Sequence, residues 1–380
     1  MKKIVPSDSV IVIGILARDC VRSLRSNIEK VEKLGKMFGD YHVVILENDS
    51  KDGTDEEIKD WSEKNPKVTY INERIELPQS ITTLECPYPE KGVHRIEKMA
   101  RLRNRVLDEL EKRFQPDVFC FIDIDIQDFF PSSIVQAIEN APKDWGGLFG
   151  NGIVFWDSSE GKKYVSPFQY DSFAYVAQGD DYTLRGDYVV TPEFHPQVAY
   201  QMTLGLRTYE YLPCESAFNG IGVYRYDAIA GARYSILQND ALKAINSSLC
   251  EHIGFNKKVR EKGYGIYIAR EMKVIYHHKL IRNIIGDIAF DFSYVFSLSN
   301  NQIPFGLSEL RPGVLALIES WYYQKNVIET KLNTNAEETL RIVQRKNYKH
   351  LRWLRILIVV SVVELLTLII LIFLNFIARI

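Results

Sequence analysis

Two carboxylates, Asp123 and Asp125, lie two residues apart where an apolar segment gives way to polar sequence. The preceding residues, 118–122, are rich in β-branched and aromatic side chains, which predicts a buried strand. Acids this close at a strand end repel each other unless a positive charge lies between them. Carboxylate oxygens bind Mn²⁺ and Mg²⁺, and such sites usually leave room for substrate phosphates. The pair therefore predicts a Mn²⁺ or Mg²⁺ site, although a strand that simply passes into an acidic loop gives the same short pattern.

The segments around this pair alternate between strand and helix patterns. Continuous apolar character predicts buried strands at 10–16, 41–46, 68–72 and 118–122, and helical periodicity predicts helices at 20–38, 55–64 and 93–113. This alternation predicts an α/β fold, Rossmann-like, with a mainly parallel central sheet and flanking helices. Ligands of such sheets bind beyond the carboxyl ends of the strands.

Polar residues collect at these strand ends. Ala17 and Arg18 follow the first strand, and Glu47 and Asn48 follow the second. Together with the acids after the fourth strand, they predict a binding site at one edge of the sheet. Acids and amides beyond the second strand can hydrogen-bond the ring N–H groups of a base, so we expect Glu47 and Asn48 to contact a base and its ribose.

The predicted helix 93–113 is strongly basic. Arg95 and Arg103 are eight residues apart and share a face, whereas Arg101 lies to the side. A guanidinium group is well suited to bind phosphate or a base carbonyl, so we expect these arginines to contact a nucleotide. Solvated charges on a helix surface are the alternative.

The later part of the chain mixes strands, loops and helices. Strand patterns occupy 145–155, 217–224, 266–269 and 273–276, and a helix is predicted at 250–262. Asp171 and Glu215 fall in aromatic loops and are candidates to contact sugar hydroxyls, and Trp156 could stack on a sugar face. Residues 281–347 carry no chemical signal.

Bulk composition excludes several classes of protein. The chain has 380 residues, of which 46% are apolar and 25% charged, as expected of a globular protein. A net charge of −2 gives no reason to expect a nucleic-acid partner. The five cysteines form no Cys-x-x-Cys pattern, which favours a reduced compartment and argues against a disulfide frame or a zinc site.

The C-terminal residues predict a membrane anchor. Residues 356–378 are almost wholly apolar, and about 20 such residues cross a bilayer. Six Lys and Arg residues lie in 341–355, before this segment, and only Arg379 follows it, so the positive-inside rule places the large N-terminal part in the cytoplasm. An N-glycosylation pattern at Asn48-Asp49-Ser50, within the predicted site, mildly supports that side. A buried or interfacial helix is the alternative to a span.

The ordered motifs resemble a known family. Val-Ile-Val-Ile-Gly-Ile-Leu-Ala-Arg-Asp, Glu-Asn-Asp-Ser, Arg-Leu-Arg-Asn and Phe-Ile-Asp-Ile-Asp together resemble the nucleotide-sugar half of a GT-A glycosyltransferase, most closely the capsule-associated mannosyltransferases. Phe218-Asn219-Gly220 and Cys250-Glu251-His252 then match acceptor-side motifs, which implies an acceptor or sugar contact for Asn219. The similarity spans roughly residues 10–280.

This resemblance implies a division of roles. Asp125 would hold the metal, with Asp123 on the metal or on the ribose, and His277 or His278 would add a ligand. Glu251 matches the catalytic acid of the inverting motif, and a helix N-terminus tends to keep a carboxylate ionised, which suits a base. A first-turn Glu that only satisfies the helix dipole is the alternative, and His252 could substitute as the base.

We therefore predict a membrane-anchored glycosyltransferase with a UDP- or GDP-sugar as donor and a glycan or lipid-linked glycan as acceptor. The predicted domains are a GT-A domain at 1–285, divided at residue 130 into donor and acceptor halves, a helical and basic extension at 286–350, and a transmembrane helix at 351–380. The alternatives are a sugar-phosphate nucleotidyltransferase, which would need a Gly-rich phosphate loop after the first strand, and a non-enzymatic glycan-binding membrane protein.

Overall fold

We describe a computed structural model of the chain at residues 3–74, 92–157, 163–180, 202–203, 205–244 and 246–278. At 154–157, 163–168, 241 and 277–278 the description covers the backbone only. The chain divides into two units, Met1–Leu307 and Ser308–Ile380, and every described residue belongs to the first. The expected extension at 286–350 and membrane span at 351–380 lie outside the described residues. Within the described ranges, no helix has the length and apolar character needed to cross a bilayer.

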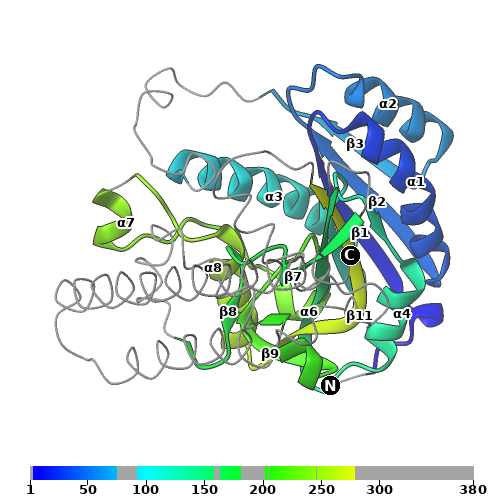
Figure 1. The fold of residues 1–380 in the computed structure, drawn as a ribbon. Helices are drawn as coiled ribbons and strands as arrows, with labels where there is room; N and C mark the ends of the chain where they lie inside the picture. Colours follow the sequence, from blue (N-terminus) through cyan, green and yellow to red (C-terminus); the bar gives the residue numbers. More distant parts are fainter. Residues whose placement is uncertain are drawn as a thin grey trace, which may run out of the picture. The chain divides into compact units, whose positions relative to one another are not determined.

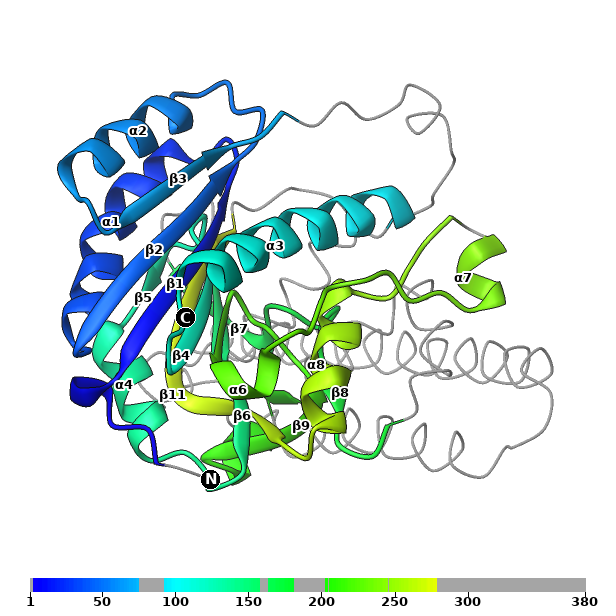
Figure 2. The ribbon, with the colours of Figure 1, turned by 180° about the vertical axis from the view of Figure 1, so that it is seen from behind.

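The first four strands form a parallel half-sheet in the order β3-β2-β1-β4. These strands are β1 (Val10–Ala17), β2 (Asp40–Glu47), β3 (Val68–Asn72) and β4 (Val118–Asp123). The helices α1 (Val21–Lys36), α2 (Thr54–Lys64) and α3 (Val93–Arg113) lie between them in the sequence. Figures 1 and 2 show α1 and α2 on one side of these strands and α3 on the other. The predicted strand and helix alternation is confirmed for this half.

The second half of the sheet is mixed. Here β10 (Ile221–Arg225) runs antiparallel to β4 and β6 (Trp145–Asp157), while β11 (Gly265–His278) runs parallel to β6. The strands β5 (Asp128–Phe129), β7 (Lys163–Gln169), β8 (Val176–Ala177) and β9 (Tyr211–Ser216) all pair antiparallel. A mainly parallel sheet is therefore a wrong prediction beyond β4. Parallel neighbours need long crossovers, whereas hairpins such as β6–β7 join antiparallel strands.

Most predicted boundaries agree with the structure within two residues, but two strand predictions do not. The segments predicted as strands at 266–269 and 273–276 are one strand, β11, with a register shift between Ile268 and Lys273. The strand predicted at 217–224 begins only at Ile221, because Asn219 and Gly220 take φ values of 53° and 80°. A left-handed backbone conformation cannot continue a strand.

Two apolar cores cover the two faces of the sheet. Alternate residues of β1 point to opposite faces, so Ile11 and Ile13 pack with α1, α2 and α4 (Pro131–Glu139), whereas Val12 packs with α3 and α8 (Glu251–Glu261). The described elements thus form three layers, helix, sheet and helix. The shorter elements are η1 (Pro6–Asp8), α6 (Tyr226–Ile229) and α7 (Asp240–Ala244).

Candidate active site

The polar strand ends lie together at one edge of the parallel half-sheet. Strand pairing puts Ala17 opposite Glu47 and Leu16 opposite Asp123. The loops after these strands are also joined, because the amide of Asn48 donates to the carbonyl of Ala17. The convergence expected from the sequence is therefore present.

Arg103 lies at the centre of this edge, between two acids. Its Nε donates a 3.1 Å hydrogen bond to Oε1 of Glu251, and its Nη2 is 3.6 Å from Oδ1 of Asp123. The side chains of Arg103 and Glu251 are only 4% and 5% exposed. The guanidinium also lies 4.8 Å from the ring centre of Phe218 and 5.1 Å from that of Phe121. Arg103 was expected to contact a nucleotide, and the structure instead pairs it with the two acids that the sequence assigned to catalysis and metal binding.

The charges at this centre are strongly coupled. Burial opposes the charge of Arg103, but Asp123 and Glu251 outweigh it, so the pKa of Arg103 lies above its usual range. Burial raises the pKa of Asp123 to about 7, with Arg103 acting against the rise and Asp125, Asp171 and Glu251 adding to it. Burial likewise raises the pKa of Asp171 to about 6. Positive charge beyond that of Arg103 would therefore be stabilised here.

Asp171 is held by the turn that precedes β10. Its two oxygens accept hydrogen bonds from the amides of Asn219, at 3.3 Å, and Ala174, at 3.1 Å. The side chain of Asn219 is fully buried and donates to the carbonyl of Gly150, at 2.7 Å. Asn219 was expected at the acceptor, but these bonds make it a support for Asp171. The carbonyl of Gly220, the next residue, accepts a 2.8 Å hydrogen bond from the amide of Asp123.

Asp125 is exposed to solvent beside this buried centre. Burial raises the pKa of Asp125, and its own backbone amide, Arg103 and Arg95 each act against this rise. Arg95 is itself exposed. An exposed carboxylate and an exposed guanidinium that interact electrostatically are suited to a ligand that combines a divalent cation with phosphate oxygens.

The residues present fit a divalent cation that shares its ligands with a substrate. Among the described residues, no group of three or more His, Cys, Asp and Glu side chains could hold a metal by itself. Mg²⁺ commonly needs only one or two carboxylates together with substrate phosphates, and Asp123 and Asp125 can supply these. His277 and His278 are the last two residues of β11 rather than part of a turn after it, opposite Phe155 and Trp156, and their side chains lie outside the description.

Glu251 is the first residue of α8, as the sequence predicted. His252 beside it is 2% exposed and its ring stacks on Phe218, with centroids 3.9 Å apart. Burial and the nearby Arg103 hold the pKa of His252 well below its ordinary value, so it is neutral. Within the described residues neither ring nitrogen has a hydrogen-bond partner, and Nε2 is 3.9 Å from Oε1 of Glu251. Glu251 therefore has the better-connected side chain of the two candidates for a base.

The donor side of the edge combines supporting and open residues. Glu47 is buried, and its oxygens accept hydrogen bonds from the amide of Ser50, at 2.7 Å, and the side chain of Asn72, at 2.9 Å. Asn48 is also buried and donates to Asp49. Arg18, in contrast, is exposed. The bonds of Glu47 shape the loop after β2, and Arg18 is the exposed residue among the four predicted at the ends of β1 and β2.

Two other predicted contacts lie away from this centre. Arg101 is exposed and donates a 3.0 Å hydrogen bond to Glu73. Glu215 is a residue of β9 rather than of a loop, and it pairs with Arg260 and accepts from the amide of Gly179. For Trp156 only the backbone is described, in β6.

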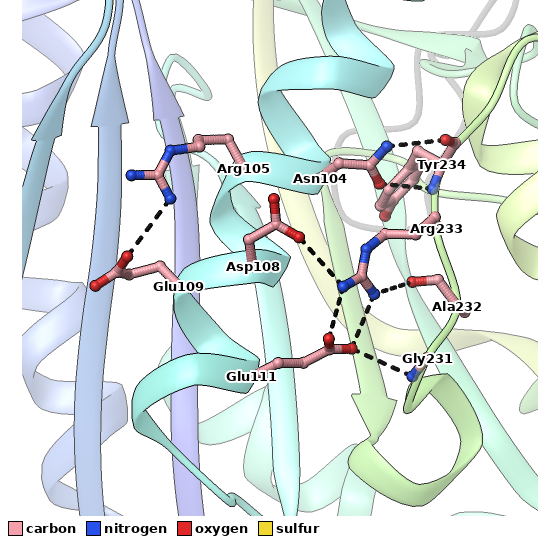
Figure 3. A network of polar contacts seen from close by, with 9 residues as sticks. All are labelled: Asn104, Arg105, Asp108, Glu109, Glu111, Gly231, Ala232, Arg233 and Tyr234. Carbon is pink, nitrogen blue, oxygen red and sulfur yellow. Dashed lines mark hydrogen bonds and ion pairs between the residues drawn. The ribbon is translucent and has the colours of Figure 1, made fainter.

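Polar bonds fix α3 against the segment after α6 (Figure 3). Asn104 exchanges two hydrogen bonds with the backbone of Tyr234, at 2.8 and 3.0 Å. Arg233 binds both Asp108 and Glu111, which lie one and two turns after Asn104 on the same helix face. These contacts hold the ring of Tyr234 at 5.8 Å from the Arg103 guanidinium. Contacts outside the sheet, between α3 and the segment after α6, therefore help to position the buried Arg103.

Sequence reasoning missed several supporting residues. Lys98 is 11% exposed and lies 3.9 Å from Asp49, one helical turn from Arg95 on α3, a spacing that could have marked it. Tyr276 is buried beside Asp123, and Tyr170 stacks on it with centroids 3.4 Å apart. Asn27 is a polar residue within the buried apolar stripe of α1. This interruption was the only sequence feature that could have identified Asn27 as a supporting residue.

Comparison with known sequences supports the assignment that this geometry suggests. The sequence profile of the family described as "Cryptococcal mannosyltransferase 1" matches residues 10–248, more than half of the chain. The chain belongs to this family. It is therefore a glycosyltransferase, and the resemblance noted from the motifs is confirmed. The match includes Asp123, Asp125 and Arg103 and ends just before Glu251. No protein with a curated description matches the chain.

Three solved structures show a low similarity to this chain. One is the mannosyltransferase PcManGT from Pyrobaculum calidifontis, solved with GDP-Man and Mn²⁺; it has 9% identity and a TM-score of 0.41, covering 91% of this chain and 82% of that chain. Another is GalNAc-T7, solved with UDP, GalNAc and Mn²⁺; it has 10% identity and a TM-score of 0.37, covering 71% of this chain and 44% of that chain. A third is TarS 1–349 from S. aureus, with 11% identity and a TM-score of 0.35, covering 75% of this chain and 63% of that chain.

Proposed function

We propose that this family member is a metal-dependent, inverting hexosyltransferase of the GT-A type. It would move a sugar from a UDP- or GDP-sugar to a glycan or a lipid-linked glycan. The observation that carries the proposal is the line Asp123–Arg103–Glu251, in which Arg103 and Glu251 are buried and the side chain of Asp123 is 29% exposed. This line joins the acid at the end of β4 to the acid that begins α8. One arginine thus links the expected leaving-group side of the reaction to the expected base.

The donor side follows from the exposed part of the site. Asp125, together with Asp123, would hold Mn²⁺ or Mg²⁺, which when bound supplies positive charge to the departing diphosphate. Arg95, which interacts electrostatically with Asp125, would bind phosphate oxygens. Arg18 and the Asn48 loop would contact the base and ribose. This division assigns the exposed basic residues to the nucleotide and leaves Arg103 for the protein's own acids.

The acceptor side depends on Glu251. Its carboxylate would accept the proton of the acceptor hydroxyl as that oxygen attacks the sugar carbon. Arg103 and the N-terminus of α8 both place positive charge beside this carboxylate. Asp171, partly buried and oriented by Asn219, would hydrogen-bond sugar hydroxyls between the two acids.

The same proposal extends to the residues outside the description. We propose a catalytic domain over 1–285, with His278 or His277 as a further metal ligand and Trp156 against the sugar. An extension over 286–350 and a single membrane span over 351–380 would follow, with the catalytic domain on the cytoplasmic side. An anchor on the same chain as the catalytic domain would suit a lipid-linked acceptor.

Turnover of a panel of nucleotide sugars tests the proposal. The wild-type chain, incubated with Mn²⁺, should release one nucleoside diphosphate from one donor, and Asp125→Ala should lose this activity. Glu251→Gln should lower kcat by about 10²–10⁴-fold while leaving the affinity for the nucleoside diphosphate unchanged, because the amide can still accept from Arg103. Asp60→Asn, at an exposed acid of α2, is the matched control and should behave as wild type.

Two outcomes would contradict the proposal. Donor hydrolysis that persists in Asp125→Ala would remove the metal assignment. Release of pyrophosphate from a nucleoside triphosphate and a sugar phosphate, with no nucleotide-sugar turnover, would instead support the nucleotidyltransferase alternative.

A further inference from the structure

Asn27 of α1 binds the turn that carries Asp125. Its Nδ2 donates to the carbonyl of Ile124, at 3.2 Å, and to the carbonyl of Ile126, at 2.9 Å. These are the two residues on either side of Asp125. The asparagine is fully buried, in a helix that is separated from the turn by 97 positions in the sequence.

The turn is also held by its own backbone and by burial. The amide of Ile126 donates to the carbonyl of Asp123, and the amide of Gln127 donates to the carbonyl of Ile275. Ile124 and Ile126 are 1% and 0% exposed, so both anchor the turn in the core while Asp125 is exposed. Apolar burial alone is not directional. The Asn27 amide adds a direction, because it fixes the peptide unit between Ile124 and Asp125 and the unit between Ile126 and Gln127, on the two sides of Asp125.

Lys30 sets the orientation of this amide. Its Nζ donates a 3.2 Å hydrogen bond to Oδ1 of Asn27, which leaves the amide nitrogen facing the two carbonyls. The same Nζ forms a 2.7 Å ion pair with Asp128, two residues after Ile126. Asn27 and Lys30 therefore hold the turn from both of its ends.

We propose that Asn27, oriented by Lys30, is a positioning residue for the divalent cation held by Asp125. The proposal rests on the proposed function, since it needs a metal at Asp125. Residues that orient metal ligands from behind typically change metal affinity by about 10–100-fold when they are replaced. If Asn27 served only to satisfy two buried carbonyls, its loss would lower stability without changing the dependence on metal.

The test uses the full-length chain with Mn²⁺ and GDP as probes. In Asn27→Asp the side chain keeps its size but can no longer donate to either carbonyl. The Mn²⁺ concentration that gives half of the maximal rise in melting temperature, at fixed GDP, should increase by about 10–100-fold. The Mn²⁺ concentration for half-maximal turnover should increase in parallel, and saturating Mn²⁺ should restore most of kcat.

Asn65→Asp is the matched control. The amide of Asn65 also donates two hydrogen bonds, to Glu32 and Tyr41, but at the end of α2 away from the strand ends. This variant should lower the melting temperature and leave the Mn²⁺ midpoint at the wild-type value. Lys30→Met, a milder change at a partly exposed residue, should raise the midpoint by a smaller factor.

The outcomes are distinct. Equal Mn²⁺ midpoints for Asn27→Asp and Asn65→Asp would overturn the proposal. Should Asn27→Asp fail to fold, an unchanged midpoint in Lys30→Met would overturn it. A wild-type chain that shows no response to Mn²⁺ with GDP, and none when UDP replaces GDP, would overturn the proposed function and this inference together.

Discussion

Arg103 and Glu251 form a buried ion pair across 148 positions of sequence, with a 3.1 Å hydrogen bond from Nε to Oε1. The pair joins α3 to the first turn of α8, and Asp123 approaches the same guanidinium from the sheet. A charge this deeply buried is stable only while its partners remain. The three residues therefore form one electrostatic unit, and changing any one of them should affect the other two.

Replacing Arg103 should be costly for folding. Arg103→Met leaves Asp123 and Glu251 without their shared cation, and removing one partner of a buried pair typically costs about 3–5 kcal/mol. Arg101→Met, on the same helix, breaks only an exposed pair with Glu73 and should cost less than about 1 kcal/mol. Urea unfolding of both variants measures the difference. Equal losses would show that the buried unit does not contribute to stability.

Gly220 should tolerate a side chain poorly. Its φ is +80°, and a Cβ there would overlap the hydroxyl of Tyr276. Gly231 has a similar φ of +72°, but among the described residues no atom beyond its two chain neighbours lies within 4 Å of the added carbon. Left-handed strain should cost each alanine variant about 1–2 kcal/mol, and overpacking should cost Gly220→Ala a further 1–3 kcal/mol or so.

Gly220→Ala should also lower donor turnover, because the Gly220 carbonyl accepts a hydrogen bond from the amide of Asp123 in the candidate active site. Melting temperatures test the stability difference, and donor turnover tests the effect on the site. A Gly220→Ala protein as stable and active as Gly231→Ala would contradict both expectations.

Glu32 should make stability depend on pH. Burial raises its pKa, but hydrogen bonds from Trp61 and Asn65 outweigh burial, so its pKa lies below the ordinary 4.5. The unfolded chain therefore binds the proton more readily, and the stabilisation is complete above pH 4.5 and is lost as the pH falls through the lower folded pKa.

Glu32→Gln should accordingly lower the free energy of unfolding by about 1–2 kcal/mol at pH 7, and the difference from wild type should shrink in acid. Glu29→Gln, at an exposed position of the same helix, is the control and should show no such trend. Denaturant titrations at several pH values measure both. A difference that stays constant from pH 7 into acid would contradict the assignment.

Local patterns in the sequence were sufficient for the elements and for the polar ends of the strands. Continuous apolar runs and helical periods placed β1 to β4 and α1 to α3 because these periodicities reflect which side chains must be buried. They also placed Asp123 at the end of β4 and Glu251 at the start of α8. The strand at 217–224 was drawn too long, since the left-handed turn at Asn219 and Gly220 leaves no trace in hydrophobic periodicity.

The sequence by itself determined which residues are charged and where the strands of the parallel half-sheet end, but only the tertiary structure decided which charges meet. Helical periodicity shows that Arg95 and Arg103 share a face of α3. It cannot show that Arg95 is exposed near Asp125, whereas Arg103 is buried and pairs with Asp123 and Glu251. Asn27 likewise interrupts an apolar stripe because its amide binds the carbonyl of Ile124, 97 positions away in the sequence. Such pairings depend on how separate elements pack, because a buried polar group must find its partner wherever the fold brings one within hydrogen-bonding distance.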